Sequence, residues 1–436
     1  MTRAPGSRPP SSAPAHANTS SHRPRQPGAS LAQIAPPRIV EFEPIPAQFK
    51  PRRPAPFRMD LSEILPEQTR DATLKAIADS GRMAFQCVGD TGGIKRPESQ
   101  QLVARGMEAA LKSARSSPSF CYHIGDVVYY NGEVQEYWPQ FYEPYEHYPL
   151  PIVAIPGNHD GEKLAPDSIS LEGFYQNFLA ERPGTFTHES RDSGRTAMSQ
   201  PNFYWTLTTP FATFIGLYTN VPEHGKITPE QRQWFQGEMH DADPDKALIV
   251  ALHHPVYSFD DHHSGSSNMA LELQNAINAS RRIPNLVLTA HVHNYQRIEL
   301  KTAGVTIPFF VIGNGGYWNL HHLTQHPGYQ DPGTEAVLIA AVDDRHGFMT
   351  FEIGAKVING YFTTVPRPQE SWSDVRLYDS SFDVFSYQAA PMHLPAGATA
   401  ALVPGAGSHL PPHPDIPKPV PPARGAAHGS ARREGH

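Results

Sequence analysis

The sequence of 436 residues predicts an α/β fold built from two sheets, and two features of its pattern indicate this class. Short apolar runs of strand length alternate with amphipathic segments of helical period, which is typical of parallel strands covered by helices. Several of these runs end at Asp, Asn or His. Ligand sites in α/β sheets open at the carboxyl ends of strands, so we expect one site along that edge.

The individual elements follow in chain order. We expect strands at 83–88, 120–124, 152–156, 211–217, 247–252 and 285–290. We expect helices at 97–115, 171–182, 227–239 and 268–281. The helix at 227–239 has Thr228 as its cap, Pro229 in the first turn and Gln231 at the third position, which is a typical start.

The last third of the core changes character. The runs "PFFVIG", "AVLIAAV", "FMTFEI" and "KVINGYFTTV" are joined by short polar turns, and they predict antiparallel strands that close a second sheet. Residues 161–200 form a long insertion after "GNHD". A loop of that length beside a site is typical of a lid or specificity element.

The composition divides the chain into three parts. Residues 1–57 are rich in Pro, Ser, Ala and Arg, and residues 366–436 are rich in Pro, Ala, Gly and His, so both are predicted to be disordered. Residues 58–365 form the predicted domain. Residues 1–57 carry a charge of +6 and the remainder −13, which argues against a nucleic-acid partner.

Other features bound the class of protein. No run approaches 18 apolar residues, so no membrane span is expected. Cys87 and Cys121 lie in apolar runs and are predicted to be buried free thiols rather than a disulfide framework. The basic N-terminus lacks the apolar segment of a secretory signal, which makes a cytoplasmic location the default expectation.

Five strand ends carry residue types that bind metals. One such residue alone is more often part of a turn or a satisfied core side chain, but five in succession indicate convergence at one sheet edge. Carboxylate, amide and imidazole ligands without thiolate suit Fe, Mn or Zn. They are too many for one catalytic ion, so two ions bridged by a carboxylate fit better. The candidates are Asp90, Asp126, Asn158, His159, His253, His291 and His293.

The order GD…GDxxY…GNH…HxP…HxH resembles the calcineurin-like metallophosphoesterases, and specifically the purple acid phosphatases, over about residues 83–365. The resemblance implies a two-sheet αββα sandwich with a dinuclear metal site at the strand carboxyl ends. Two features depart from the family pattern. Ala290 replaces the usual Gly before HxH, and the family is typically secreted, which leaves the compartment open.

The stretch "FQCVGDTGGI" carries the most specific part of the resemblance. Other superfamily members have Asp-x-His here, whereas purple acid phosphatases have Asp-x-Gly and a tyrosine three residues after the second Asp. This sequence has Gly92 and Tyr129 at those positions. The alternative for Tyr129 is a packed aromatic side chain, since Tyr130 follows it.

The resemblance also assigns ligands and metals. The first metal, Fe(III), would take Asp90, Tyr129 and His293, and Asp126 would bridge. The second, a divalent Fe, Zn or Mn, would take Asn158, His253 and His291. His159 and His263 would contact the phosphate and supply a proton to the leaving group.

The activity implied is acid phosphatase-type hydrolysis of a small-molecule phosphate monoester by hydroxide formed at the metals. Two alternatives stay open: a phosphodiesterase or nucleotide pyrophosphatase on the same fold, and a metal-poor scaffold that only binds a protein partner. The sequence gives no oligomeric state.

Overall fold

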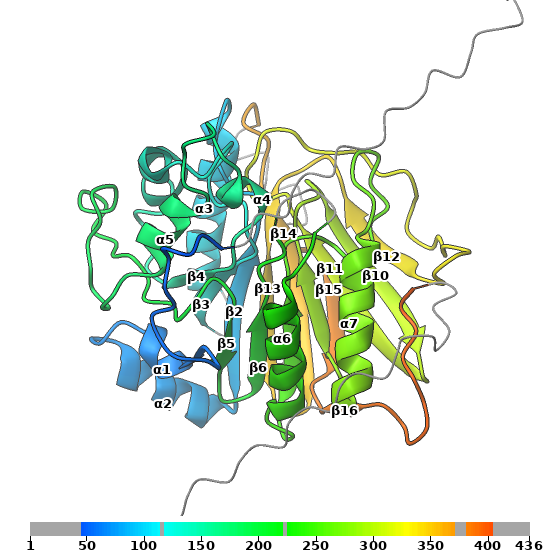
Figure 1. Cartoon of the computed structure of the whole chain (residues 1–436). Helices are drawn as coiled ribbons and strands as arrows, with labels where there is room; N and C mark the ends of the chain where they lie inside the picture. Colours follow the sequence, from blue (N-terminus) through cyan, green and yellow to red (C-terminus); the bar gives the residue numbers. More distant parts are fainter. Residues whose placement is uncertain (1–44, 114–116, 221–224, 371–380, 404–436) are drawn as a thin grey trace, which may run out of the picture. The chain divides into compact units, whose positions relative to one another are not determined.

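Two β-sheets lie face to face in the computed structural model (Figure 1). The structure describes residues 45–113, 117–220, 225–370 and 381–403. The eight-stranded sheet has the order β1 (Arg58–Asp60), β5 (Trp205–Thr208), β6 (Ala212–Gly216), β7 (Ala247–Ala251), β9 (Leu286–Thr289), β11 (Val305–Ile312), β10 (Tyr295–Thr302) and β12 (Val337–Val342). The six-stranded sheet has the order β15 (Ser381–Gln388), β14 (Val357–Thr364), β13 (Gly347–Gly354), β2 (Arg82–Val88), β3 (Pro118–His123) and β4 (Ile152–Ala154).

Both sheets are mixed. Strands β2, β3 and β4 are parallel to one another, and so are β6, β7, β9 and β11. Antiparallel pairs extend both groups: β13 pairs with β2, and β10 pairs with β11. A small pair, β8 (Arg282–Ile283) with β16 (Met392–His393), lies apart from the two sheets. The predicted two-sheet α/β fold is therefore confirmed.

Aromatic side chains fill the space between the sheets. Phe85 of β2 and Phe214 of β6 lie edge to face with ring centroids 5.0 Å apart, and Phe310 and Phe351 lie 5.5 Å apart. All four are almost completely buried. Burying each such ring contributes about 1.5–3 kcal/mol, so this aromatic layer holds the two sheets in a fixed relation to each other.

Helices cover the outer faces. Helices α6 (Pro229–Asp241) and α7 (Ser267–Ser280) pack on the eight-stranded sheet (Figure 1). Helices α3 (Pro97–Ser113) and α5 (Glu172–Phe178) share a cluster with residues of the six-stranded sheet. The predicted start of α6 is confirmed, since Thr228 caps it by accepting a 3.1 Å hydrogen bond from Gln231 N.

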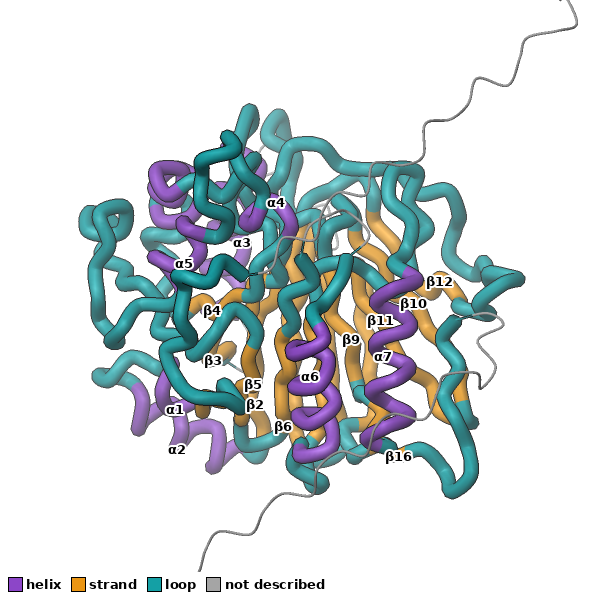
Figure 2. The backbone as a smooth tube through the Cα atoms, in the orientation of Figure 1, coloured by secondary structure: helices purple, strands orange, loops and turns teal. Residues whose placement is uncertain are grey.

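The remaining helical elements are short or peripheral. They are α1 (Leu61–Ile64), α2 (Arg70–Ser80), the 3-10 turn η1 (Val134–Glu136), the π-helical turn η2 (Trp138–Tyr142) and α4 (Asn158–Gly161). In Figure 2, loops occupy the edge of the sheets at which α4 lies. None of the helices among the described residues combines the length and apolar character needed to cross a membrane.

The structure corrects the expected sheet assignment. A single parallel sheet does not carry all five motif strands, because β2, β3 and β4 lie in one sheet and β7 and β9 in the other. The strands at 305–312 and 337–342 also join the sheet of β7 and β9, whereas β13 and β14 extend the sheet of β2 together with β15. Apolar pattern identifies a strand, but its partner is chosen by tertiary packing.

The folded part also extends beyond the predicted boundaries. Phe49 stacks on Tyr175 with ring centroids 4.3 Å apart, and β15 pairs with β14 along its length. Residues 45–57 and 381–403 are therefore ordered parts of the fold, although their composition resembled the tails. Within the predicted tails, residues 1–44, 371–380 and 404–436 lie outside the described residues.

Two smaller predictions can be compared with the structure. Cys87 and Cys121 are free and buried, as predicted. The insertion at 161–200 is anchored by Phe174 and Phe178, which are buried in the cluster on the six-stranded sheet. This packing shows a docked segment rather than an open loop.

Candidate metal centre

Three candidate ligands sit in strained backbone directly after strands. Asp90, Asp126 and His291 have φ angles of 54°, 53° and 68°, and they follow β2, β3 and β9. The left-handed region costs a non-glycine residue about 1–2 kcal/mol, and such strain clusters at functional sites. Backbone hydrogen bonds from Asp90 N to Gly125 O and from Thr91 N to Asp126 O, both 3.1 Å, join the first two turns.

A first trio of side chains meets at the end of β2. The Tyr129 hydroxyl lies 3.1 Å from Asp90 Oδ1 and 3.3 Å from His293 Nε2. The direct distance from His293 Nε2 to Asp90 Oδ1 is 3.5 Å. All three residues are buried. These three donor atoms, from three separate loops, could hold one cation.

A second trio lies beside it. Asn158 Oδ1 is 2.9 Å from His291 Nδ1 and 3.2 Å from His253 Nε2. His253 Nδ1 lies 2.8 Å from the Ile124 carbonyl and donates to it, which leaves Nε2 as the ligand nitrogen. His293 uses its Nδ1 in the same way toward Asn319 O, at 2.9 Å.

Asp126 lies between the two trios. Its Oδ2 is 3.1 Å from the Tyr129 hydroxyl and 3.3 Å from His253 Nε2, so one carboxylate reaches a member of each. Atoms of Asp126, His253 and His291 all lie within 4.8 Å of one another, as the ligands of one ion must. The arrangement suits a carboxylate that bridges two ions.

The side chains fit cations better than they satisfy one another. In His291, Nδ1 is the nitrogen that faces Asn158 Oδ1, at 2.9 Å, whereas Nε2 of the same ring is buried and has no hydrogen-bond partner among the described residues. The donor set of two carboxylates, a phenol, an amide oxygen and three imidazoles is that of hard or borderline ions. The residues present therefore fit a dinuclear metal centre.

The electrostatics of the protein alone agree with this fit. Burial opposes ionisation of Asp126, but His253 and His159 outweigh it and hold the pKa of Asp126 well below its usual value. Burial lowers the pKa of His253, but Asp126 outweighs it and raises that pKa to about 9. Burial, followed by the Asp126 and Asp90 charges, raises the pKa of Tyr129 far above its usual value. A bound cation would replace the proton that Tyr129 holds and the second proton that His253 holds.

Two glycines make room for the ligands. A Cβ at Gly92 would lie 2.6 Å from Tyr129 Cδ2 and 2.5 Å from Gln140 Oε1, and a Cβ at Gly157 would lie 2.1 Å from Asp126 Oδ1. The space beside Asp90 is thus taken by the Tyr129 ring. Gln140 fixes the Tyr129 backbone, since it accepts from Tyr129 N at 2.9 Å and donates to Tyr129 O at 2.7 Å.

The two predicted phosphate-contacting histidines lie at the rim. His159 donates its backbone N–H to Asp126 Oδ1 at 2.9 Å, and its ring centroid is 4.4 Å from that of Tyr129. Its ring Nδ1 faces Tyr130 O and Glu162 rather than the ligand trios. The His263 ring is half-buried, and its centroid lies 4.7 Å from that of His291.

Sequence reasoning missed several residues of this region. Asp160 accepts hydrogen bonds from Val127 N at 3.1 Å and Gly157 N at 2.9 Å, which joins the turns that carry Asp126 and Asn158. Tyr317 stacks on Tyr129 with centroids 4.1 Å apart. Tyr317 belongs to the glycine-rich segment "GNGGYWNLHH" after β11. The position of this polar segment directly after a strand is the sequence feature that could have indicated a role for Tyr317 at the site.

A second His/Asp group lies close by. Asp260, His262 and His321 also place potential ligand atoms within 4.8 Å of one another. The two candidate groups share no residue. His321 is nevertheless adjacent to the first trio, because its ring centroid lies 4.3 Å from that of His293.

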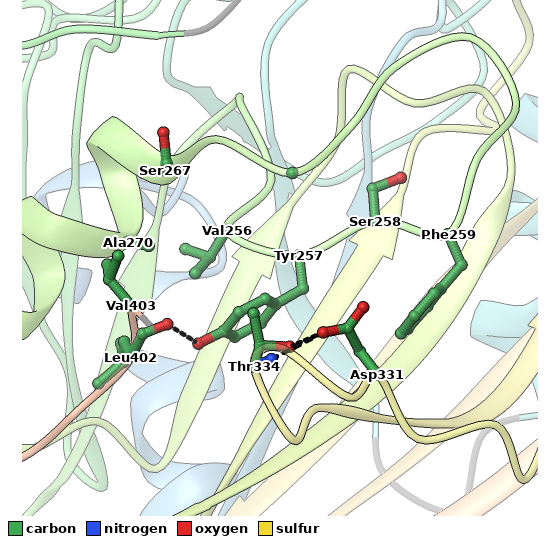
Figure 3. Close-up of a pocket in the computed structure, with 11 residues that line it drawn as sticks. Val256, Tyr257, Ser258, Phe259, Ser267, Ala270, Asp331, Thr334, Leu402 and Val403 are labelled. Carbon is green, nitrogen blue, oxygen red and sulfur yellow. Dashed lines mark hydrogen bonds between the residues drawn. The ribbon is translucent and has the colours of Figure 1, made fainter. Parts of the chain in front are cut away.

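A cavity of about 170 Å³ lies away from this chemistry (Figure 3). It is bordered by the segment after β7, the start of α7, the turn at Asp331 and the residues Leu402 and Val403. Tyr257 spans it and donates a 2.7 Å hydrogen bond to Leu402 O. None of the candidate ligands lines it, so the cavity is separate from the metal centre.

Comparisons with known proteins agree with the geometry. Residues 83–295 match the family model described as calcineurin-like phosphoesterase. No curated protein sequence gives a significant match to the chain.

Solved structures show a distant likeness in fold. One is GAP50, described as the anchor in the inner membrane complex of Plasmodium, with 14% identity, a TM-score of 0.48, and coverage of 71% of this chain and 89% of that one. A structure described as PhoD has 13% identity, a TM-score of 0.45, and coverage of 72% of each chain. A dimetal phosphatase from Danio rerio has 10% identity, a TM-score of 0.44, and coverage of 70% of this chain and 99% of that one.

Proposed function

We propose that this chain, which belongs to the calcineurin-like metallophosphoesterase superfamily, is a phosphomonoesterase of the purple acid phosphatase type. One observation carries the proposal. Asp126 Oδ2 lies within 3.3 Å of both the Tyr129 hydroxyl and His253 Nε2, where a carboxylate can bridge two ions. Dinuclear centres of this kind clamp the attacking and leaving oxygens of a phosphoryl displacement.

Each trio would hold a different ion. Asp90, Tyr129 and His293 would hold Fe(III), because the phenol of Tyr129 is an anionic hard ligand once it loses its proton. Asn158, His253 and His291 have one neutral amide and two imidazoles, which suit a divalent Fe, Zn or Mn.

The protein residues would orient the reaction. Bound cations would neutralise the phosphate charge and lower the pKa of water at the site, which supplies the nucleophile. The oxygen–phosphorus bond to the water oxygen forms as the bond to the ester oxygen breaks. His159 at the rim would pass a proton to the departing alkoxide, and His263 would hold a phosphate oxygen.

A matched pair of substrates tests the proposal. The metal-loaded protein should hydrolyse 4-nitrophenyl phosphate with a kcat/KM at least tenfold above that for bis(4-nitrophenyl) phosphate. The reverse order would assign the phosphodiesterase alternative. If the protein contains two ions per chain but neither substrate is cleaved faster than by the Asp126→Asn variant, the protein-binding scaffold is the better description.

A further inference from the structure

Asp260 forms hydrogen bonds to three loops beside the metal centre, and it is not among the site residues predicted from the sequence. Its carboxylate accepts hydrogen bonds from the backbone N–H groups of His262 and His263, at 3.0 and 2.9 Å. It also accepts from Asn294 Nδ2 at 2.9 Å, next to the candidate ligand His293. The Asp260 side chain is completely buried. A buried carboxylate with this many partners holds its neighbours in one arrangement.

The fourth partner of Asp260 is His321. Its Nδ1 lies 3.2 Å from Asp260 Oδ2, and its side chain is only 3% exposed. The backbone fixes it as well, since His321 N donates to His293 O at 3.1 Å. In the described part of the chain, the ring's hydrogen bond is made by Nδ1, which leaves Nε2 for a ligand.

His321 and His263 lie side by side at the rim. Their ring centroids are 5.3 Å apart, and they lie 4.3 Å from His293 and 4.7 Å from His291, respectively. Each imidazole therefore adjoins one of the two candidate trios. Asp260 bonds to both residues, so a single carboxylate sets both positions.

A third metal ion at Asp260, His262 and His321 is the competing explanation. Their ligand atoms are close enough, but the His262 and His321 rings are stacked, with an interplanar angle of 13° and centroids 4.4 Å apart. Nitrogen lone pairs lie in the ring plane, so those of parallel stacked rings do not converge on one ion. The Asp260 oxygens are also already occupied by four hydrogen bonds.

We infer that His321, oriented by Asp260, forms with His263 a subsite that binds a non-reacting oxygen of the substrate phosphate. Because Nδ1 donates to Asp260, Nε2 of the neutral His321 ring accepts from a protonated phosphate oxygen, and it donates to an unprotonated one when the ring carries both protons. Asp260 acts as a positioning residue and does not touch the substrate. This inference rests on the proposed function, since it assigns a second contact to the same phosphate.

The test measures binding of inorganic phosphate to full-length protein loaded with iron and zinc, by titration calorimetry. His321→Ala should raise the Kd about tenfold, which is the loss of one hydrogen bond to a charged ligand. Metal content should stay unchanged. His322→Ala is the matched control, because His322 is 77% exposed and pairs with Asp343 at 3.6 Å. The phosphate Kd of this control variant should equal that of the wild type.

A double-mutant cycle separates positioning from general structural damage. Asp260→Asn should also raise the Kd, and the Asp260→Asn, His321→Ala double variant should be no weaker than the worse single variant, because both changes remove one contact. Full additivity would contradict the positioning role. Should Asp260→Asn fail to fold, His321→Ala and His321→Gln still test the subsite.

The outcomes distinguish this inference from the proposed function. Ester hydrolysis with an unchanged phosphate Kd in His321→Ala would overturn the subsite and leave the phosphatase proposal standing. Weaker phosphate binding in that variant, in a protein that cleaves no ester, would retain the subsite and reject the phosphatase proposal. Three ions per chain in the wild type and two in His262→Ala would replace the subsite by a third metal.

Discussion

A side chain at position 92 and the ring of Tyr129 cannot occupy the same space, because a Cβ at Gly92 would lie 2.6 Å from Tyr129 Cδ2. This contact gives a physical reason for the joint occurrence of Gly92 and Tyr129 in the sequence. The tyrosine fills the position beside Asp90 that a larger residue at 92 would enter.

Gly92→Ala should displace Tyr129 from Asp90. The added methyl group also meets Gln140 Oε1 at 2.5 Å, and overpacking of this kind costs about 1–3 kcal/mol of unfolding free energy. Thermal unfolding measures the loss. Gly237→Ala is the control, since nothing lies within 4 Å of its Cβ and alanine favours the helix. Equal stability of Gly92→Ala and the wild type would contradict the steric explanation.

Tyr129→Phe should abolish the visible absorption of the iron-loaded protein. The proposed phenolate ligand of Fe(III) gives a charge-transfer band in the visible region, and phenylalanine keeps the ring but not the oxygen. Tyr130→Phe is the matched control, and it should keep the band. A Tyr129→Phe protein that contains iron and remains purple would rule out Tyr129 as the ligand.

His159→Ala should lower kcat/KM without removing metal. General acid catalysis contributes about 10²–10⁴-fold, or about 3–5 kcal/mol of barrier, and the effect should be smaller for nitrophenyl than for alkyl phosphates. Good leaving groups need little protonation. His188→Ala changes a histidine that is 75% exposed and serves as control. Loss of metal from His159→Ala would instead place His159 among the ligands.

Strand β15 should be essential for stability. Phe385 is 8% exposed and belongs to the core between the sheets, so Phe385→Ala should cost about 3 kcal/mol of unfolding free energy. Val384→Ala, at a neighbour that is 69% exposed, should be close to neutral. Denaturant unfolding of both variants decides this, and equal midpoints would show that β15 adds little.

Removal of residues 404–436 is a separate case. Their composition predicts a disordered tail, and a chain that ends at Val403 should keep the stability of the full-length protein.

The sequence predicts the strands that carry ligands because each is a short apolar run with an abrupt polar end. The apolar runs before Asp90 and His253 illustrate this, and they correspond to β2 and β7. It does not predict that these two strands lie in different sheets. Sheet pairing depends on contacts between distant residues such as Phe85 and Phe214, which no local pattern encodes.

The rim residues were harder to predict for the same reason. His321 and His322 are adjacent and chemically identical, yet His321 is buried against Asp260 and His322 is 77% exposed.

Strand β15 was not predicted because it lies in a Pro-rich and Ala-rich part of the sequence. Phe385 is held there by packing, and Asp383 by a bidentate pair with Arg297 at 2.7 and 2.9 Å.

Metal removal and return is the most direct test of the central claim. The hydrolysis rate of 4-nitrophenyl phosphate should vanish when a chelator strips the full-length protein, and it should return as iron and zinc reach two ions per chain. Asp126→Asn should lose more bound metal than any other single ligand variant, because Asp126 lies within reach of both trios. Asp167 is exposed, so the control variant Asp167→Asn should behave like the wild type. A stripped protein that hydrolyses the ester at the full rate, or an Asp126→Asn protein that keeps both ions and full turnover, would contradict the dinuclear phosphatase.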